Sequence, residues 1–233
     1  MKILCVSDEI DPFIYNSSAK EIFGDVDAVL CAGDLPMDYI DFIVSTLNKP
    51  TYFVFGNHNL KEYNYYHKEE SSAVSYSNSI PAAAAHGHGA IYAGFKCLAD
   101  KNLLIMDKRT KKMRPLLIAG VSGCMDYNHG LCQYSEFEMS IHLLLLAPKL
   151  LWNKLRYGTF VDIFLTHASP RHIHDKEDPC HRGFECFSKF IKRYKPAFMV
   201  HGHIHLYDKN EERVGVYGST TVINAYSHYV MEI

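Results

Sequence analysis

The sequence lacks several features that would place the protein in a large class at once. Its seven cysteines include no C-x-x-C pair, and apolar runs such as 143–147 are far shorter than the roughly 20 residues that span a membrane. The formal net charge is only -2, which argues against a dedicated binder of long nucleic acid, because such proteins usually carry a basic face. From these absences we expect that the protein spans no membrane and has no nucleic-acid partner.

The cysteines and the first residues indicate where the protein works. Cys5 and Cys31 sit in apolar, strand-like runs, where a free thiol behaves as a small hydrophobe, so we expect a reducing environment. The acidic pair Asp8-Glu9 follows the first apolar run too soon for the apolar region of a signal peptide. A cytoplasmic location is therefore predicted.

Strand-like and helix-like segments alternate along the chain. Apolar runs predict strands at 3–6, 28–32, 51–55, 116–121, 161–165 and 197–200. Helical spacing and capping signals predict helices at 17–23, 37–47, 135–152 (kinked at Pro148) and 183–194. Long loops are expected over 59–114, with short strands at 91–95 and 103–106, and closing antiparallel strands are expected at 214–217, 220–224 and 229–233. With no repeat or linker, residues 1–233 are predicted to form one α/β domain.

A histidine-rich segment, His201-Gly202-His203-Ile204-His205, follows the predicted strand at 197–200. Alternate residues of a strand point the same way, so His203 and His205 are expected to project together. Two imidazoles on one side offer nitrogen to a divalent cation, and the simpler alternative is a histidine-rich turn without a ligand. His86-Gly87-His88 has a similar pattern but follows an alanine run, so a loop is the better interpretation there.

Polar side chains able to bind a metal follow the predicted strands one after another. In chain order they are Asp8, Asp34, Asn57, His167, His203 and His205. Carboxyl ends of parallel strands meet at one edge of a sheet, which brings such side chains together. Hard oxygen ligands with several imidazoles suit a two-metal hydrolytic site, in which Asp34 suits the position between the two ions. Asn57 adds an oxygen without adding negative charge, so the site remains attractive to a phosphate.

Four short motifs in this order resemble those of the calcineurin-like metallophosphoesterase superfamily. They are Gly33-Asp34-Leu35-Pro36-Met37-Asp38, Gly56-Asn57-His58, Thr166-His167 and Gly202-His203-Ile204-His205. The similarity extends over residues 2–58 and 161–224. It implies a four-layer αββα sandwich, in which two mixed β-sheets pack together with helices outside, and this agrees with the alternation of strands and helices.

The resemblance also implies a role for each candidate. Asp8, Asp34 and His205 would hold one metal ion. Asp34, Asn57, His167 and His203 would hold the other. His58 resembles the family histidine that faces the phosphate and protonates, or hydrogen-bonds, the departing oxygen, an effect worth about a hundred- to ten-thousand-fold in rate. The nitrogen and oxygen ligands suit manganese, iron or zinc as the two divalent cofactor ions.

The chain departs from the family pattern at two positions. The usual first motif is Asp-x-His, but here it is Asp8-Glu9-Ile10, and isoleucine cannot coordinate a metal. Water, Glu9 or Asp11 would have to fill the place, with water and Asp11 preferred, so the first metal site is expected to be weak. Asn59 stands where an acidic residue commonly follows the histidine, which would alter the orientation of His58.

The segment from His167 to Gly183 is dense in side chains that bond phosphates or orient ligands. Arg171, His174, Asp178 and His181 are the candidates, and we select His181 as the substrate-binding residue. The alternative is a solvated loop before the helix at 183–194. Asp126-Tyr127-Asn128-His129 is a weaker candidate for the same rim.

The predicted function is hydrolysis of a small phosphomonoester or phosphodiester by a hydroxide that bridges two metal ions. A nuclease is the alternative within enzymes, and the missing basic surface disfavours it. A different alternative is a metal-binding protein of the same fold in which Ile10, in place of histidine, has weakened catalysis.

Overall fold

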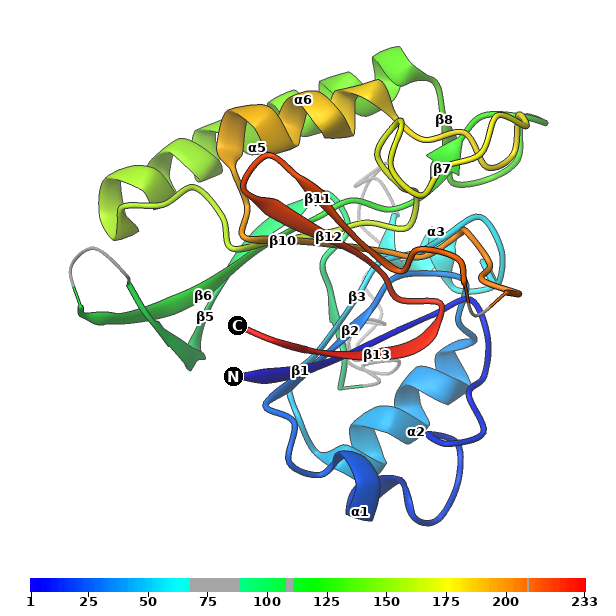
Figure 1. The fold of residues 1–233 in the computed structure, drawn as a ribbon, viewed down its shortest axis with the longest axis vertical. Helices are drawn as coiled ribbons and strands as arrows, with labels where there is room; N and C mark the ends of the chain where they lie inside the picture. The colour runs from blue at the N-terminus through cyan, green and yellow to red at the C-terminus, as the bar shows by residue number, and fades with distance from the viewer. Residues whose placement is uncertain (68–88, 108–110, 209) are drawn as a thin grey trace, which may run out of the picture.

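Two β-sheets lie face to face between layers of helices in the computed structural model (Figure 1), which describes residues 1–67, 89–107, 111–208 and 210–233. Helices α1 (Ala19–Phe23) and α2 (Met37–Leu47) cover one sheet. Helices α5 (Glu136–Tyr157) and α6 (Glu185–Tyr194) cover the other, and the short α3 (Tyr63–Tyr66) follows the first sheet's third strand in sequence. The predicted four-layer α/β sandwich of two mixed sheets is confirmed.

The first sheet has the strand order β13-β1-β2-β3-β4. Its strands are β1 (Lys2–Ser7), β2 (Ala28–Cys31), β3 (Thr51–Phe53), β4 (Ile91–Tyr92) and β13 (Ser227–Glu232). Strands β1 to β4 run parallel, and β13 pairs antiparallel with β1 from the far end of the chain.

The second sheet has the order β11-β12-β10-β9-β6-β5, with antiparallel pairs at both edges and parallel pairs between them. Its strands are β5 (Lys96–Met106), β6 (Met113–Gly120), β9 (Ile163–Leu165), β10 (Phe198–His201), β11 (Val214–Tyr217) and β12 (Thr220–Asn224). A small parallel pair, β7 (Cys124–Met125) with β8 (Gln133–Tyr134), lies apart from both sheets.

Strand alternation explains how the layers pack. In β1, Ile3 and Cys5 face the second sheet and belong to the apolar cluster between the sheets. Leu4 and Val6 point to the opposite face, where they pack with residues of α1 and α2. A third cluster joins the outer face of the second sheet to α5 and α6. The two inner faces thus fix one sheet against the other, with parallel strands in both.

Several local expectations need correction. Strand β5 has eleven residues, where the sequence predicts only a short strand at 103–106 within long loops. The helix predicted at 135–152 begins with the expected Ser135–Glu138 capping box, but it continues through Pro148 to Tyr157.

The pair His86 and His88 lies outside the described residues. Within the described ranges, no helix has both the length and the apolar character to cross a membrane.

Candidate metal centre

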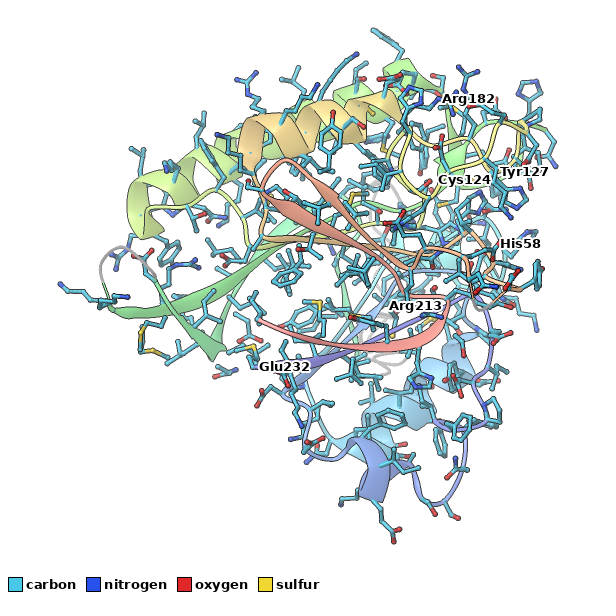
Figure 2. The ribbon with its side chains drawn as sticks, viewed as in Figure 1. His58, Cys124, Tyr127, Arg182, Arg213 and Glu232 are labelled. Carbon is cyan, nitrogen blue, oxygen red and sulfur yellow. The ribbon has the colours of Figure 1, made fainter. Side chains whose placement is uncertain are left out.

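The metal-ligand candidates meet at one end of the sandwich. Asp8 follows β1, Asp34 follows β2 and Asn57 follows β3, whereas His167 follows β9 and His203 follows β10. Because these strands are parallel within their sheets, their carboxyl ends share an edge, and the two edges lie together. Figure 2 shows His58 and Tyr127 at this end, with Glu232 toward the other.

Asp34, His167 and His203 form the buried centre of this cluster, and one ligand atom from each lies within 4.8 Å of the others. The Nε2 atom of His167 is 3.4 Å from Asp34 Oδ2 and 3.2 Å from Asn57 Oδ1. Both oxygens are acceptors, so a bare Nε2 lone pair facing them would be repulsive. A cation is needed at this point, either a proton or a metal ion.

Each imidazole is oriented by a carbonyl that can only accept a hydrogen bond. His167 Nδ1 donates to Ala32 O at 2.9 Å, which leaves Nε2 as the nitrogen facing the cluster. His203 Nε2 donates to Cys180 O at 2.5 Å, which leaves Nδ1 as its ligand atom. Asn57 Nδ2 donates to Tyr127 Oη at 3.3 Å, so Oδ1 turns toward His167. The donor set therefore fits a transition-metal ion.

The protonation of this cluster without a metal follows from its charges. Burial by itself raises the pKa of Asp34 and lowers that of His167, but their mutual attraction and hydrogen bond outweigh it. The pKa of Asp34 falls well below its usual value, helped by the His58 amide at 2.7 Å, and the pKa of His167 rises to about 9. Burial and the charge on His167 lower the pKa of His203 to about 3. One proton on His167 thus takes the place of the cation.

Asp8 is held by the main chain of the His203 turn. Its two carboxylate oxygens each accept from the amide of His203 at 3.0 Å, and His205 Nε2 is 3.8 Å from Oδ1. Burial is the largest cause of the raised pKa of Asp8. His205 is partly exposed, with Nδ1 bonded to Tyr207 Oη at 2.7 Å and its ring stacked on Tyr226.

Backbone conformation places these groups. Asp8, Asp34 and His203 have φ values of 69°, 57° and 69°, a left-handed conformation that is uncommon outside glycine and is favoured at functional sites. A Cβ on Gly56 would lie 2.0 Å from Asp34 Oδ1 and 2.6 Å from the His167 ring, so only glycine fits there.

The structure corrects the expectation that His203 and His205 project together from one face of a strand. Strand β10 ends at His201, and His203 sits in a bend, so His203 and His205 do not share a strand face. The ring of His203 packs 4.8 Å from that of His167, whereas His205 approaches Asp8. Both side chains therefore lie at the strand ends, His203 beside His167 and His205 near Asp8.

The position of the missing ligand is exposed, with Ile10 at 46% of its full accessibility. Asp11 is engaged elsewhere, because its carboxylate bonds the Phe13 amide, Ser227 and His228. Glu9 accepts a hydrogen bond from Tyr226 at 3.0 Å. The carboxylate of Asp11 is already engaged, so the preference for Asp11 as the replacement ligand finds no support.

The remaining candidates lie around the rim. The side chain of His58 is exposed, and Asn59 bonds the Asp34 carbonyl at 2.9 Å, so Asn59 holds Asp34 and not the His58 ring. His181 packs 5.4 Å from the His203 ring, and its Nδ1 bonds Asp178 at 2.8 Å.

Two other candidates in this loop are committed to protein partners. Arg171 pairs with Asp175 at 2.5 Å and with Glu177 at 2.8 Å. His174 bonds His201 at 2.8 Å. Sequence reasoning missed Ala32 and Cys180, because they act through carbonyls, which no side-chain pattern can indicate.

A sandwich of two mixed sheets with this nitrogen and oxygen cluster at the strand ends is the arrangement of the calcineurin-like metallophosphoesterase fold. The chain belongs to the calcineurin-like phosphoesterase family, whose model matches residues 1–207. Membership of this family supports metal-dependent hydrolysis of phosphoesters as the general activity. None of the curated proteins matches the sequence significantly.

Solved structures share the fold at low sequence identity. The protein TT1561 of Thermus thermophilus is 16% identical, with a TM-score of 0.60 over 97% of this chain and 89% of its own. GAP50, the anchor in the inner membrane complex of Plasmodium, is 11% identical, with a TM-score of 0.52 over 96% of this chain and 70% of its own. At these identities the likeness concerns the fold alone.

Proposed function

We propose that the protein, as one domain over residues 1–233 in the cytoplasm, hydrolyses a small phosphomonoester or phosphodiester with two divalent metal ions. The observation that carries the proposal is the meeting of Asp34 Oδ2, Asn57 Oδ1 and His167 Nε2, three atoms that need a proton or a metal ion between them. Such a cluster attracts a cation, and its place at the strand ends leaves the outer side open to a substrate.

Two ligand groups share Asp34. One consists of Asp34, Asn57, His167 and His203, and the other of Asp8, Asp34 and His205. Manganese, iron or zinc suits these ligands. When bound, the two ions would supply the attacking hydroxide and neutralise charge on the phosphoryl group.

His58 and His181 are the residues proposed to meet the substrate. The amide of His58 is tied to Asp34, which puts its exposed ring at the mouth of the cluster, where it would give a proton to the departing oxygen. Asp178 accepts from Nδ1 of His181, which leaves Nε2 as the nitrogen turned outward beside His203; as an imidazolium, the ring would donate from Nε2 to a phosphoryl oxygen.

The test is manganese-dependent release of nitrophenol from bis-p-nitrophenyl phosphate. We expect His58→Asn to lower kcat by about a hundred- to ten-thousand-fold for an alkyl phosphoester, because a departing alkoxide needs a proton whereas nitrophenolate does not, while bound metal, measured by elemental analysis, is unchanged. His172→Asn, in an exposed side chain of the same end, serves as the matched control and should retain full activity. Unchanged kcat in His58→Asn would reject its role as acid.

The same assay tests a second candidate function, a metal-binding protein with weakened catalysis. It is favoured by Ile10 at the position of a ligand and by the engagement of Asp11 in other hydrogen bonds. Tight retention of metal without release of nitrophenol would favour that function. It would be established if nucleotides, cyclic nucleotides and phosphopeptides were not hydrolysed either.

A further inference from the structure

Three potential ligand side chains of different chemistry gather in the segment between β9 and α6. Asp178 Oδ1 lies 2.9 Å from Cys180 Sγ and 2.8 Å from His181 Nδ1, and the sulfur is 3.8 Å from that nitrogen. Cys180 and His181 are half-buried and Asp178 is exposed, so the group is accessible from solvent. No ligand of the proposed phosphoesterase centre belongs to this group.

The spacing is close to that of a tetrahedral metal site. Zinc lies about 2.3 Å from a thiolate and about 2.0 Å from nitrogen or a carboxylate oxygen, which puts neighbouring ligand atoms roughly 3.3–3.6 Å apart. The observed separations differ from these by about half an ångström, an adjustment that rotation of solvent-accessible side chains supplies. All three come from one short stretch of chain, so little backbone has to move.

Without a metal ion, the hydrogen bond to Asp178 raises the pKa of the Cys180 thiol, so the sulfur keeps its proton until a cation replaces it. Asp178 accepts hydrogen bonds from Cys180 and His181, which lower its pKa to about 2, so it is a carboxylate at neutral pH. On binding of a cation, the thiol of Cys180 would release its proton to solvent, and the imidazole proton of His181 would move from Nδ1 to Nε2. The result is one thiolate, one carboxylate and one neutral imidazole around the ion.

We propose that Asp178, Cys180 and His181 form an additional metal site for a borderline-soft divalent cation such as Zn²⁺. Sulfur distinguishes it from the main centre, where the ligands are nitrogen and oxygen only. Three protein ligands leave a fourth position open to water or a phosphoryl oxygen. The site adjoins the main centre, because the carbonyl of Cys180 accepts from His203 and the ring of His181 packs against His203.

The test loads the full chain with Co²⁺, whose bond to a thiolate gives a charge-transfer band in the near ultraviolet. We expect this band in the wild type and its loss in Cys180→Ser, together with one cobalt ion fewer per chain. Cys97→Ser is the matched control, because Cys97 is a half-buried thiol outside the cluster, and it should keep both signals. Asp178→Asn should weaken cobalt binding at this site at least tenfold. Because this variant keeps Cys180, it gives a second test if Cys180→Ser does not fold.

Absence of the band in the wild type, or equal cobalt content in wild type and Cys180→Ser, would overturn the proposal. Neither result depends on turnover. Failure of the phosphoesterase proposal would appear separately, as missing hydrolysis of bis-p-nitrophenyl phosphate by a chain that still shows the band.

Discussion

At the scale of single residues, main-chain groups aim the metal-ligand candidates. The carbonyls of Ala32 and Cys180 select which nitrogen of His167 and His203 faces the cluster. The amides of His58 and His203 bond the carboxylates of Asp34 and Asp8. These contacts fix lone-pair directions before any metal arrives, so little reorganisation is needed on binding.

The metal-free protein should lose stability as the pH rises through the pKa of His167. Its pKa in the folded state, about 9, lies above its ordinary value of 6.5, so its contribution is fully present below pH 6.5 and lost as pH rises through 9. On the order of 3 kcal/mol of unfolding free energy should disappear over this window. Urea unfolding of chelator-treated protein measures it.

The control for this experiment is His167→Asn, which should show a flat profile between pH 6.5 and about 8.5, below the ordinary pKa of the buried thiols. A wild-type curve as flat as that of the variant would mean that no proton occupies the position between Asp34 and Asn57.

The residue at position 10 should govern the strength of the first metal site. Ile10 supplies no ligand atom and Asp11 is committed to Ser227 and His228, so the first ion should leave first on dialysis against a chelator. Ile10→His adds the missing imidazole and should raise retention of this ion at least tenfold. Elemental analysis of dialysed protein checks it, with Ile10→Gln as the control. Two ions retained equally by the wild type would contradict the expectation.

At the scale of elements, bounds were predictable where one face of a segment is buried. The helix at 37–47 and the strands at 214–217 and 220–224 have the predicted limits, because their apolar residues recur at the period of the element. Strand β5 was missed over 96–102, since it is an edge strand with Leu103 as its one buried residue. Although it forms an antiparallel hairpin with the next strand, β6, its side chains are mostly exposed or half-buried and give no clear apolar alternation.

An ion pair at the amino ends of β6 and β9 should matter for stability but not for activity. Arg114 forms two hydrogen bonds to Asp162, of 2.6 and 2.7 Å, and both side chains are largely buried. Arg114→Met leaves the carboxylate buried without its cation, which should cost about 3 kcal/mol in urea unfolding. Arg156→Met, in an exposed residue of α5, should change stability by about 0.5 kcal/mol or less. Equal stability of the two variants would contradict this role, and kcat should be unchanged in both.

At the scale of the whole molecule, the candidate site joins the two sheets. Asp8, Asp34 and Asn57 come from the first sheet, and His167 and His203 from the second. The order of strand-end motifs, through the family that it resembles, was sufficient to predict the two-sheet sandwich, and the structure places ligand atoms of Asp34, His167 and His203 within 4.8 Å of one another. It was insufficient for the bend at His203 and the engagement of Asp11, because both depend on contacts with distant segments, Asp8 and Ser227.

Metal binding should therefore stabilise the entire fold and not only the site. An ion bound to ligands of both sheets and present at a thousandfold excess over its Kd adds about 4 kcal/mol to the free energy of unfolding. For a chain of this size the Tm should rise by about 10 °C on addition of manganese to metal-free protein. His203→Ala should abolish most of the shift, and calorimetry measures both. A Tm that is independent of manganese would exclude an ion shared between the sheets.

The left-handed backbone at Asp8, Asp34 and His203 limits how this chain can diverge. Of the ordinary residues, glycine, asparagine and aspartate tolerate such φ values most readily, and β-branched residues tolerate them least. A descendant that abandoned chemistry would therefore keep asparagine or glycine at these positions far more often than valine or isoleucine. The backbone torsion angles of these turns would therefore continue to restrict the residue types at the former site after its activity was lost.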